Sequence, residues 1–282
     1  MRYILITLLL AVSSLSAQTV GPEKGSLVIV GGAMQDPAIV QRFIDLAGGP
    51  DAPIVIIPTA GDADEYDQYW SGLKVWRENG ATNLTVVHTR DRKVAETEAF
   101  VKPIRAARGV FLGGGRQWRL ADSYLDTLTH KALADVLARG GVLGGSSAGA
   151  SMLSSFMVRG DTKSNEKMIG DHTVGFGFLT NAAVDQHLLR RNRQFDMLEV
   201  IDKHPELLGI GLDEDTAIVV DGNRFDVIGR SYVVIYSNTP VAGSTGRFFF
   251  MGAGDRFDMK TRQATRQATD WRPLQGVRPP QK

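Results

Sequence analysis

Short continuous apolar runs alternate with segments of helical spacing along the first half of the chain. The apolar runs, which are typical of strands buried on both faces, lie at 26–32, 52–58, 84–88, 109–112 and 141–143. Apolar residues three or four positions apart predict helices at 38–47, 66–78, 96–108, 116–128, 130–139 and 148–156. The alternation predicts βαβ units, and hence an α/β fold with a mostly parallel sheet flanked by helices.

The pattern changes after residue 210. Short strand-like runs at 217–220, 226–228, 232–236 and 247–251 are broken by Gly, Asn and Asp, and they predict antiparallel strands that complete or extend the same sheet. Nothing in this part resembles a linker between domains, so residues 18–260 are interpreted as one α/β domain. Residues 261–282 repeat Thr-Arg-Gln-Ala and end rich in proline, which indicates a loose basic tail, with a surface-binding segment as the alternative.

The N-terminus carries the features of a secretory signal peptide. Arg2 precedes the apolar run 3–12, and the small residues Ser13, Ser14, Ser16 and Ala17 follow it. The run is shorter than the about 20 apolar residues that span a bilayer, so no stable membrane insertion is expected. We therefore predict cleavage after Ala17 and export to the periplasm or the medium. An uncleaved N-terminal anchor is the alternative.

The amino-acid composition and the absence of several motifs exclude a number of functions. Lys and Arg number 32 against 31 Asp and Glu, so the net charge of +1 supplies no global field for nucleic acid. The absence of cysteine removes disulfides, thiolate catalysis and zinc-thiolate sites. Neither a P-loop, nor G-x-G-x-x-G, nor H-E-x-x-H occurs, so no cofactor or metal is expected.

Residues 145–149 (Gly-Ser-Ser-Ala-Gly) match the nucleophile elbow G-x-S-x-G between a predicted strand and a predicted helix. Such a sharp turn exposes its central serine, here Ser147, and requires neighbours without bulk, here Gly145 and Gly149. A Gly/Ser-rich turn without chemistry is the alternative. An oxyanion hole could draw backbone N–H groups from Gly114 or Gly115, after the preceding strand, and from Ala148.

A serine nucleophile needs a base, and the base needs an acid. Of the five histidines, His187 stands out because it ends a strand-like stretch and precedes Arg190, Arg191 and Arg193, a cluster suited to a substrate carboxylate. A structural histidine and a solvated basic face are the alternatives. Residues 213–215 place three acids between apolar runs, and strand alternation would put Glu214 on the face opposite its neighbours without choosing among them.

Four motifs in this order resemble the cyanophycinase and dipeptidase E group of serine peptidases. They are 111–117 (FLGGGRQ), 145–150 (GSSAGA), 185–187 (DQH) and 211–217 (GLDEDTA), and the resemblance covers about residues 26–240. It implies a fold similar to class I glutamine amidotransferases, with serine in place of their cysteine. It also implies a Ser147–His187–Glu214 triad.

The same resemblance implies a substrate pocket of Gln117, Asp185, Gln186, Arg191 and Arg193. The expected substrate is an aspartyl peptide, either the Asp-Arg polymer cleaved by cyanophycinases at β-aspartyl bonds or an α-aspartyl dipeptide. The chain departs from the family at Asp196, where cyanophycinases carry a third arginine, so the peptide stays open. Only the resemblance bears on a homodimer, which it allows.

Two other classes of function compete with the peptidase. A non-catalytic binding protein on the same fold would not need Ser147, His187 and Glu214 together. A lipase-like acyl-transfer enzyme would need an apolar pocket rather than one lined by arginine.

Overall fold

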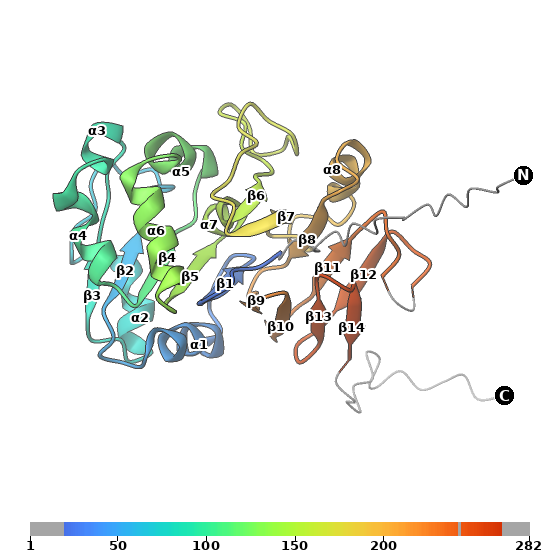
Figure 1. Ribbon diagram of the computed structural model, residues 1–282, viewed down its shortest axis with the longest axis horizontal. Helices are drawn as coiled ribbons and strands as arrows, with labels where there is room; N and C mark the ends of the chain where they lie inside the picture. Colours follow the sequence, from blue (N-terminus) through green and yellow to red (C-terminus); the bar gives the residue numbers. More distant parts are fainter. Residues whose placement is uncertain (1–19, 242–243, 267–282) are drawn as a thin grey trace, which may run out of the picture.

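The computed structural model describes residues 20–241 and 244–266. Its larger sheet has the strand order β14-β13-β10-β9-β1-β5-β4-β2-β3. The strands are β1 (Ser26–Val30), β2 (Ile54–Ile57), β3 (Leu84–Val86), β4 (Gly109–Leu112), β5 (Val142–Ser146), β9 (Thr216–Asp221), β10 (Arg224–Gly229), β13 (Arg256–Asp258) and β14 (Gln263–Thr265). Strands β1 to β5 run parallel, whereas β9, β10, β13 and β14 add an antiparallel wing (Figure 1).

Helices cover both faces of the larger sheet. One face packs against α1 (Pro37–Ala47), the 3₁₀ turn η1 (Ser71–Leu73) and α2 (Lys74–Glu78). The other packs against α4 (Glu98–Ala106), α5 (Gln117–Tyr124), α6 (Leu128–Ala138) and α7 (Ala148–Leu153), with α3 (Arg92–Ala95) beside them. Helix α1 shows how the sequence sets these bounds, because Asp36 caps its first turn, Pro37 begins it and Gly48 ends it at φ 112°. The three-layer α/β class predicted from the sequence is confirmed.

A second, five-stranded sheet lies on the other side of α7. Its order is β12-β11-β8-β7-β6, from β6 (Ser154–Phe156), β7 (Leu179–Asp185), β8 (Leu208–Leu212), β11 (Val233–Tyr236) and β12 (Phe248–Met251). Helix α8 (Met197–Lys203) packs on it through a small cluster of its own. The prediction of one sheet was wrong, because the C-terminal strands divide between two sheets: β9 and β10 join the first, and β11 and β12 the second.

Local differences from the predicted elements have visible causes. The helix predicted at 66–78 begins only at Ser71, since Tyr66 and Trp70 pack edge to face in the preceding loop. The helix predicted at 148–156 ends at Leu153, and the next residues pair with β7 as β6. The predicted tail is ordered at its start, because β14 pairs with β13 and extends the sheet past residue 260.

Two further predictions concern the ends of the chain and the insertion of the protein into a membrane. The predicted signal peptide, 1–17, and residues 267–282 lie outside the described residues. Within the part of the chain that is described, no helix combines the length and the apolar character needed to cross a bilayer.

Candidate active site

Ser147 occupies a strained turn between β5 and α7. Its backbone lies at φ 54° and ψ −114°, a conformation that non-glycine residues rarely adopt. A Cβ on Gly145 would lie 2.4 Å from the backbone of Gly149, and one on Gly149 would lie 2.3 Å from the carbonyl oxygen of Leu112. The turn therefore exists only because both positions are glycine, as the elbow motif predicts.

A chain of two short hydrogen bonds leads away from this serine. The Oγ of Ser147 lies 2.8 Å from Nε2 of His187, and Nδ1 of His187 lies 2.7 Å from Oε1 of Glu214. With one ring nitrogen donating to the carboxylate, the other is left to accept the serine proton. The structure thus brings together the three side chains that the resemblance singled out.

The pKa of His187 is lowered from its ordinary value. Burial is the main cause, and the positive charges of Arg191 and Arg193 act in the same direction, while the bond to Glu214 opposes them. The imidazole is therefore neutral near pH 7, which is the state that a general base requires.

The loop of β1 fits closely around the imidazole. His187, at φ 54°, donates its backbone N–H to the carbonyl oxygen of Gly31 at 2.9 Å. A Cβ on Gly32 would lie 2.3 Å from Cε1 of the His187 ring, so only glycine lets the ring sit there. Neither glycine lies in any of the four motifs that the sequence singles out.

The three acids at 213–215 have three separate partners. They lie in the turn between β8 and β9, so strand alternation does not apply to them. Asp213 accepts the backbone N–H groups of Leu189 and Arg190, both at 2.9 Å, and thereby holds the turn after His187. Asp215 accepts those of Gln35 and Asp36 in the β1 loop. Glu214 alone of the three bonds to His187.

The residues expected to form an oxyanion hole differ in their placement. A Cβ on Gly114 would lie 3.2 Å from the Cβ of Ser147, which puts this glycine beside the nucleophile. The Cα of Gly115 faces the carbonyl of Ala60 instead. Ala148 is the first residue of α7, where a backbone N–H has no acceptor within the helix. Gly114 and Ala148 are therefore better placed than Gly115 to receive an oxyanion.

The expected pocket residues are more buried than an open binding surface would require. Gln117 is 1% exposed and donates to the carbonyl of Val158 at 2.8 Å. Arg193 is 2% exposed and donates to Gln186 through both the backbone and the side-chain oxygen of that residue. Arg191, by contrast, is exposed on the turn that follows His187.

Asp185 and Asp196 share a partner that the sequence analysis missed. Arg159 has no exposed surface, and its Nε and Nη2 pair with the two oxygens of Asp185 at 2.7 and 3.0 Å. The same Nη2 donates to Asp196 at 2.7 Å. The only signal for Arg159 in the sequence is a lone charge after the apolar run 156–158.

The other four histidines serve elsewhere. His88 bonds to Thr59, and His130 bonds to the carbonyl of Phe176. His172 lies between two carboxylates, and the ring of His204 packs against that of Phe156 at a tilt. Among residues 20–241 and 244–266, no group of three or more His, Asp or Glu has a geometry that could hold a metal ion.

Comparison with known proteins assigns the chain to a family. The sequence profile of Peptidase family S51 matches residues 27–228. The chain belongs to peptidase family S51. It is therefore a hydrolase that acts as a peptidase, and the resemblance inferred from the four motifs is confirmed.

Relatives within peptidase family S51 match most of the chain. A cyanophycinase of Geminocystis herdmanii is 34% identical over 263 residues, which cover 85% of this chain and 96% of the relative. A cyanophycinase of a Nostoc species is 30% identical over 277 residues, covering 90% and 92%. The crystal structure of a peptidase from an acI-B1 actinobacterium superposes with a TM-score of 0.63 at 23% identity, covering 84% of this chain and 98% of that one, which supports the fold.

Proposed function

We propose that this protein is an exported serine peptidase that cleaves aspartyl peptide bonds through Ser147, His187 and Glu214. The observation that carries the proposal is the unbroken chain of hydrogen bonds, 2.8 and 2.7 Å long, that begins at a serine in a strained elbow. A non-catalytic protein would have no reason to retain the strain and the bonded base together.

The geometry supports a reaction that proceeds through an acyl-enzyme. His187 takes the proton of Ser147 as its Oγ attacks the scissile carbonyl carbon, and Glu214 stabilises the imidazolium that forms. The backbone N–H groups of Gly114 and Ala148 stabilise the tetrahedral oxyanion, and each such donor lowers the barrier by about 3–4 kcal/mol. His187 then protonates the leaving amine, and water hydrolyses the acyl-enzyme by the reverse sequence of proton transfers.

Substrate recognition rests on the positive groups beside the base. Arg191 and Arg193 follow His187 within six residues, and together with Gln117 and Gln186 they suit the carboxylate and backbone of an aspartyl residue. The relatives named cyanophycinase make the β-aspartyl bond of an Asp-Arg polymer the first substrate to test. An α-aspartyl dipeptide is the second.

The test compares the wild type with Ser147→Ala on the Asp-Arg polymer, on β-aspartyl dipeptides and on N-terminal α-aspartyl dipeptides. We expect hydrolysis of at least one class and a fall in kcat of about 10⁴-fold or more in the variant, the size seen when a serine nucleophile is removed. Ser146→Ala, the neighbouring serine of the same turn, is the matched control and should keep its activity. If the wild type cleaves none of these substrates and Ser147 does not react with a fluorophosphonate probe, the proposal fails.

Export is tested separately from activity. Expression of the full chain with its N-terminus intact should release a protein that begins at Gln18, as read by N-terminal sequencing of the extracellular or periplasmic fraction. Retention of the complete chain in the cell would contradict the export part alone.

A further inference from the structure

Two arginines are buried beside the base, and they differ in how their charges are met. Arg159 is 0% exposed and Arg193 is 2% exposed. Arg159 directs its guanidinium to two carboxylates and to two carbonyl oxygens, those of Asn165 and Glu166. Every nitrogen of this guanidinium thus has an acceptor, and its charge is balanced by Asp185 and Asp196.

Arg193 has fewer hydrogen-bond acceptors and less balancing charge than Arg159. Its Nη1 donates to the two neutral oxygens of Gln186, and its Nε is buried without an acceptor. Its only carboxylate contact among the described residues is Glu166, whose Oε1 lies 3.5 Å from Nη2 of Arg193. The side chain of Glu166 is 74% exposed. A buried guanidinium with unmet donors and one loose contact favours a further anion.

Asp185 stands within electrostatic reach of both arginines. It precedes Gln186, the residue that Arg193 contacts, and its charge acts on the pKa of Arg193 in the raising direction, against burial and the charge of Arg159. Both oxygens of Asp185 nevertheless belong to Arg159, and Oδ1 also accepts the backbone N–H of Gln186 at 2.9 Å.

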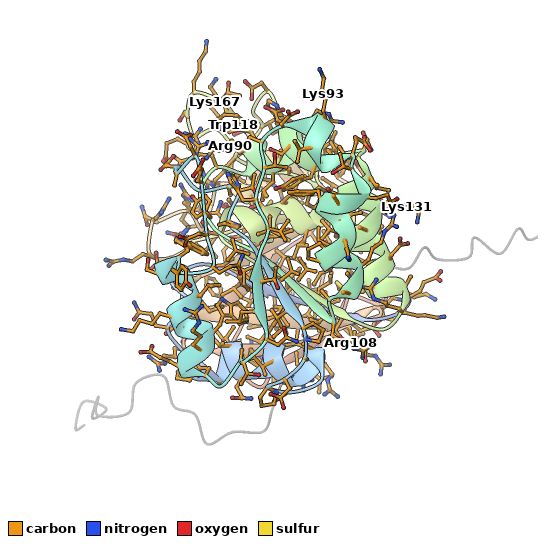
Figure 2. The ribbon with its side chains drawn as sticks, turned by 90° about the vertical axis from the view of Figure 1, so that its left-hand side faces the viewer. Arg90, Lys93, Arg108, Trp118, Lys131 and Lys167 are labelled. Carbon is orange, nitrogen blue, oxygen red and sulfur yellow. The ribbon has the colours of Figure 1, made fainter. Side chains whose placement is uncertain are left out.

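The loop that carries Arg159 stands over the same end of the molecule as the elbow. The connection between β6 and β7 rises above the strand ends in Figure 1, and Figure 2 shows its Lys167 at the end where Trp118 of α5 lies, with Arg108 at the opposite end. Arg116 donates to the carbonyl of Asp161 at 2.6 Å, which fastens this connection next to Gly114 and Gly115.

We propose that Arg159 is a positioning residue that holds Asp185 and Asp196 and so keeps Arg193 free to bind the carboxylate of the substrate. Without Arg159, Asp185 would turn to Arg193 and occupy it as an internal anion. With Arg159 in place, Glu166 is the weakly held anion at Arg193, and the carboxylate of the substrate replaces it. This inference rests on the proposed function, since it assigns the substrate group that Arg193 receives.

Arg159→Met tests the proposal in combination with Asp185→Asn. For the single variant we expect KM for an aspartyl substrate to rise about 10- to 100-fold, the range for losing a charge-assisted hydrogen bond, with kcat changed by less than about threefold. The double variant should have a KM within about threefold of that of Asp185→Asn alone, because Asp185 can then no longer occupy Arg193.

A merely structural role predicts a different result. If Arg159 only supported the fold, its loss would raise KM as much in the Asp185→Asn background as in the wild type, and that outcome would overturn the proposal. If Arg159→Met alone does not fold, the double variant decides, since replacing a buried ion pair by neutral residues of similar size is often tolerated. Arg139→Met is the matched control: Arg139 bonds the carbonyls of Ile104 and Ala107 near Arg108, and its loss should not alter KM.

Binding of succinate separates this inference from the proposed function. Calorimetry should show binding by the wild type, binding weakened about tenfold or more in Arg159→Met, and affinities within about threefold of each other in Asp185→Asn and the double variant. That pattern supports the inference even if no aspartyl peptide is cleaved. Failure of the wild type to bind succinate at millimolar concentration, or equal affinity of the wild type and Arg159→Met, overturns it even if hydrolysis is found.

Discussion

The nucleophile and its base lie on different sheets and are held by different forces. Ser147 follows β5 of the nine-stranded sheet, where backbone contacts around Gly145 and Gly149 leave room for one conformation. His187 follows β7 of the five-stranded sheet, where a set of carboxylates fixes the surrounding turns. The region around Ser147 is fixed by shape, and the region around His187 mainly by charge, with a close steric fit at Gly32.

The two kinds of support fail in different ways. Close packing around the elbow cannot relax, so an added methyl group there disturbs the fold itself. The polar network around His187 can exchange partners, so a substitution there changes proton affinity or substrate binding while the backbone stays in place. The predictions below use this contrast, beginning with the largest effect.

Gly145→Ala should abolish activity and destabilise the protein together. The new Cβ would lie 2.4 Å from backbone atoms of Gly149, which no side-chain movement can relieve. We expect a loss of about 3 kcal/mol or more in the free energy of unfolding, at the upper end of overpacking costs. Denaturant unfolding and hydrolysis assays on the same preparation measure both effects.

Gly252→Ala is the matched control for that substitution. A Cβ there meets nothing within 4 Å, so stability should stay within about 0.5 kcal/mol of the wild type. Equal stability of the two variants would contradict the view that the elbow is fixed by shape.

Glu214→Gln should leave the fold intact and lower kcat by about 10³- to 10⁴-fold, because an amide neither stabilises the imidazolium nor secures its tautomer. Asp213→Asn, one residue away, should lower kcat by only about tenfold, since Asp213 holds the turn at 189–190 and does not touch His187. Kinetics and thermal unfolding of both variants give the comparison. A larger loss in kcat for Asp213→Asn would reassign the acid.

Arg191→Gln should shift the pH profile of kcat/KM, and it should also lower the plateau of that profile because Arg191 belongs to the proposed substrate pocket. Arg191 lowers the pKa of His187, so its removal raises that pKa, and the base is then protonated at a higher pH. The acid limb of kcat/KM, expected below pH 6.5 in the wild type, should move upward. Arg224→Gln, at an exposed arginine paired with Asp258, should leave the profile unchanged. A downward shift for Arg191→Gln would refute the electrostatic account.

The first half of the fold could be predicted because its strands are buried on both faces. Runs such as 52–58 and 109–112 are apolar throughout, and that pattern marks β2 and β4 directly. The division of the C-terminal strands was beyond local patterns. Strands β9 and β11 are equally apolar, yet one pairs with β1 and the other with β8, and pairing partners are not encoded in periodicity.

The elbow was the most predictable part of the site, since its chemistry requires small residues at fixed spacing. The acid could be selected only through the resemblance, because alternation assumed a strand where the structure has a turn. Arg159 could not be found at all. Its partners are 26 and 37 residues away, and nothing local to residue 159 announces them.

The division of the site between two sheets also sets an order in time. The central strand β1 pairs with β9, so β1 gains its neighbour on that side only after residues 216–221 have been synthesised. Ser147 leaves the ribosome well before Glu214, and a serine hydroxyl without its base is a weak nucleophile. Contacts so distant along the chain form late in folding. A newly synthesised chain therefore carries an unreactive serine hydroxyl. The proposed peptidase chemistry begins only after the turn between β8 and β9, which carries Glu214, has been synthesised and has folded.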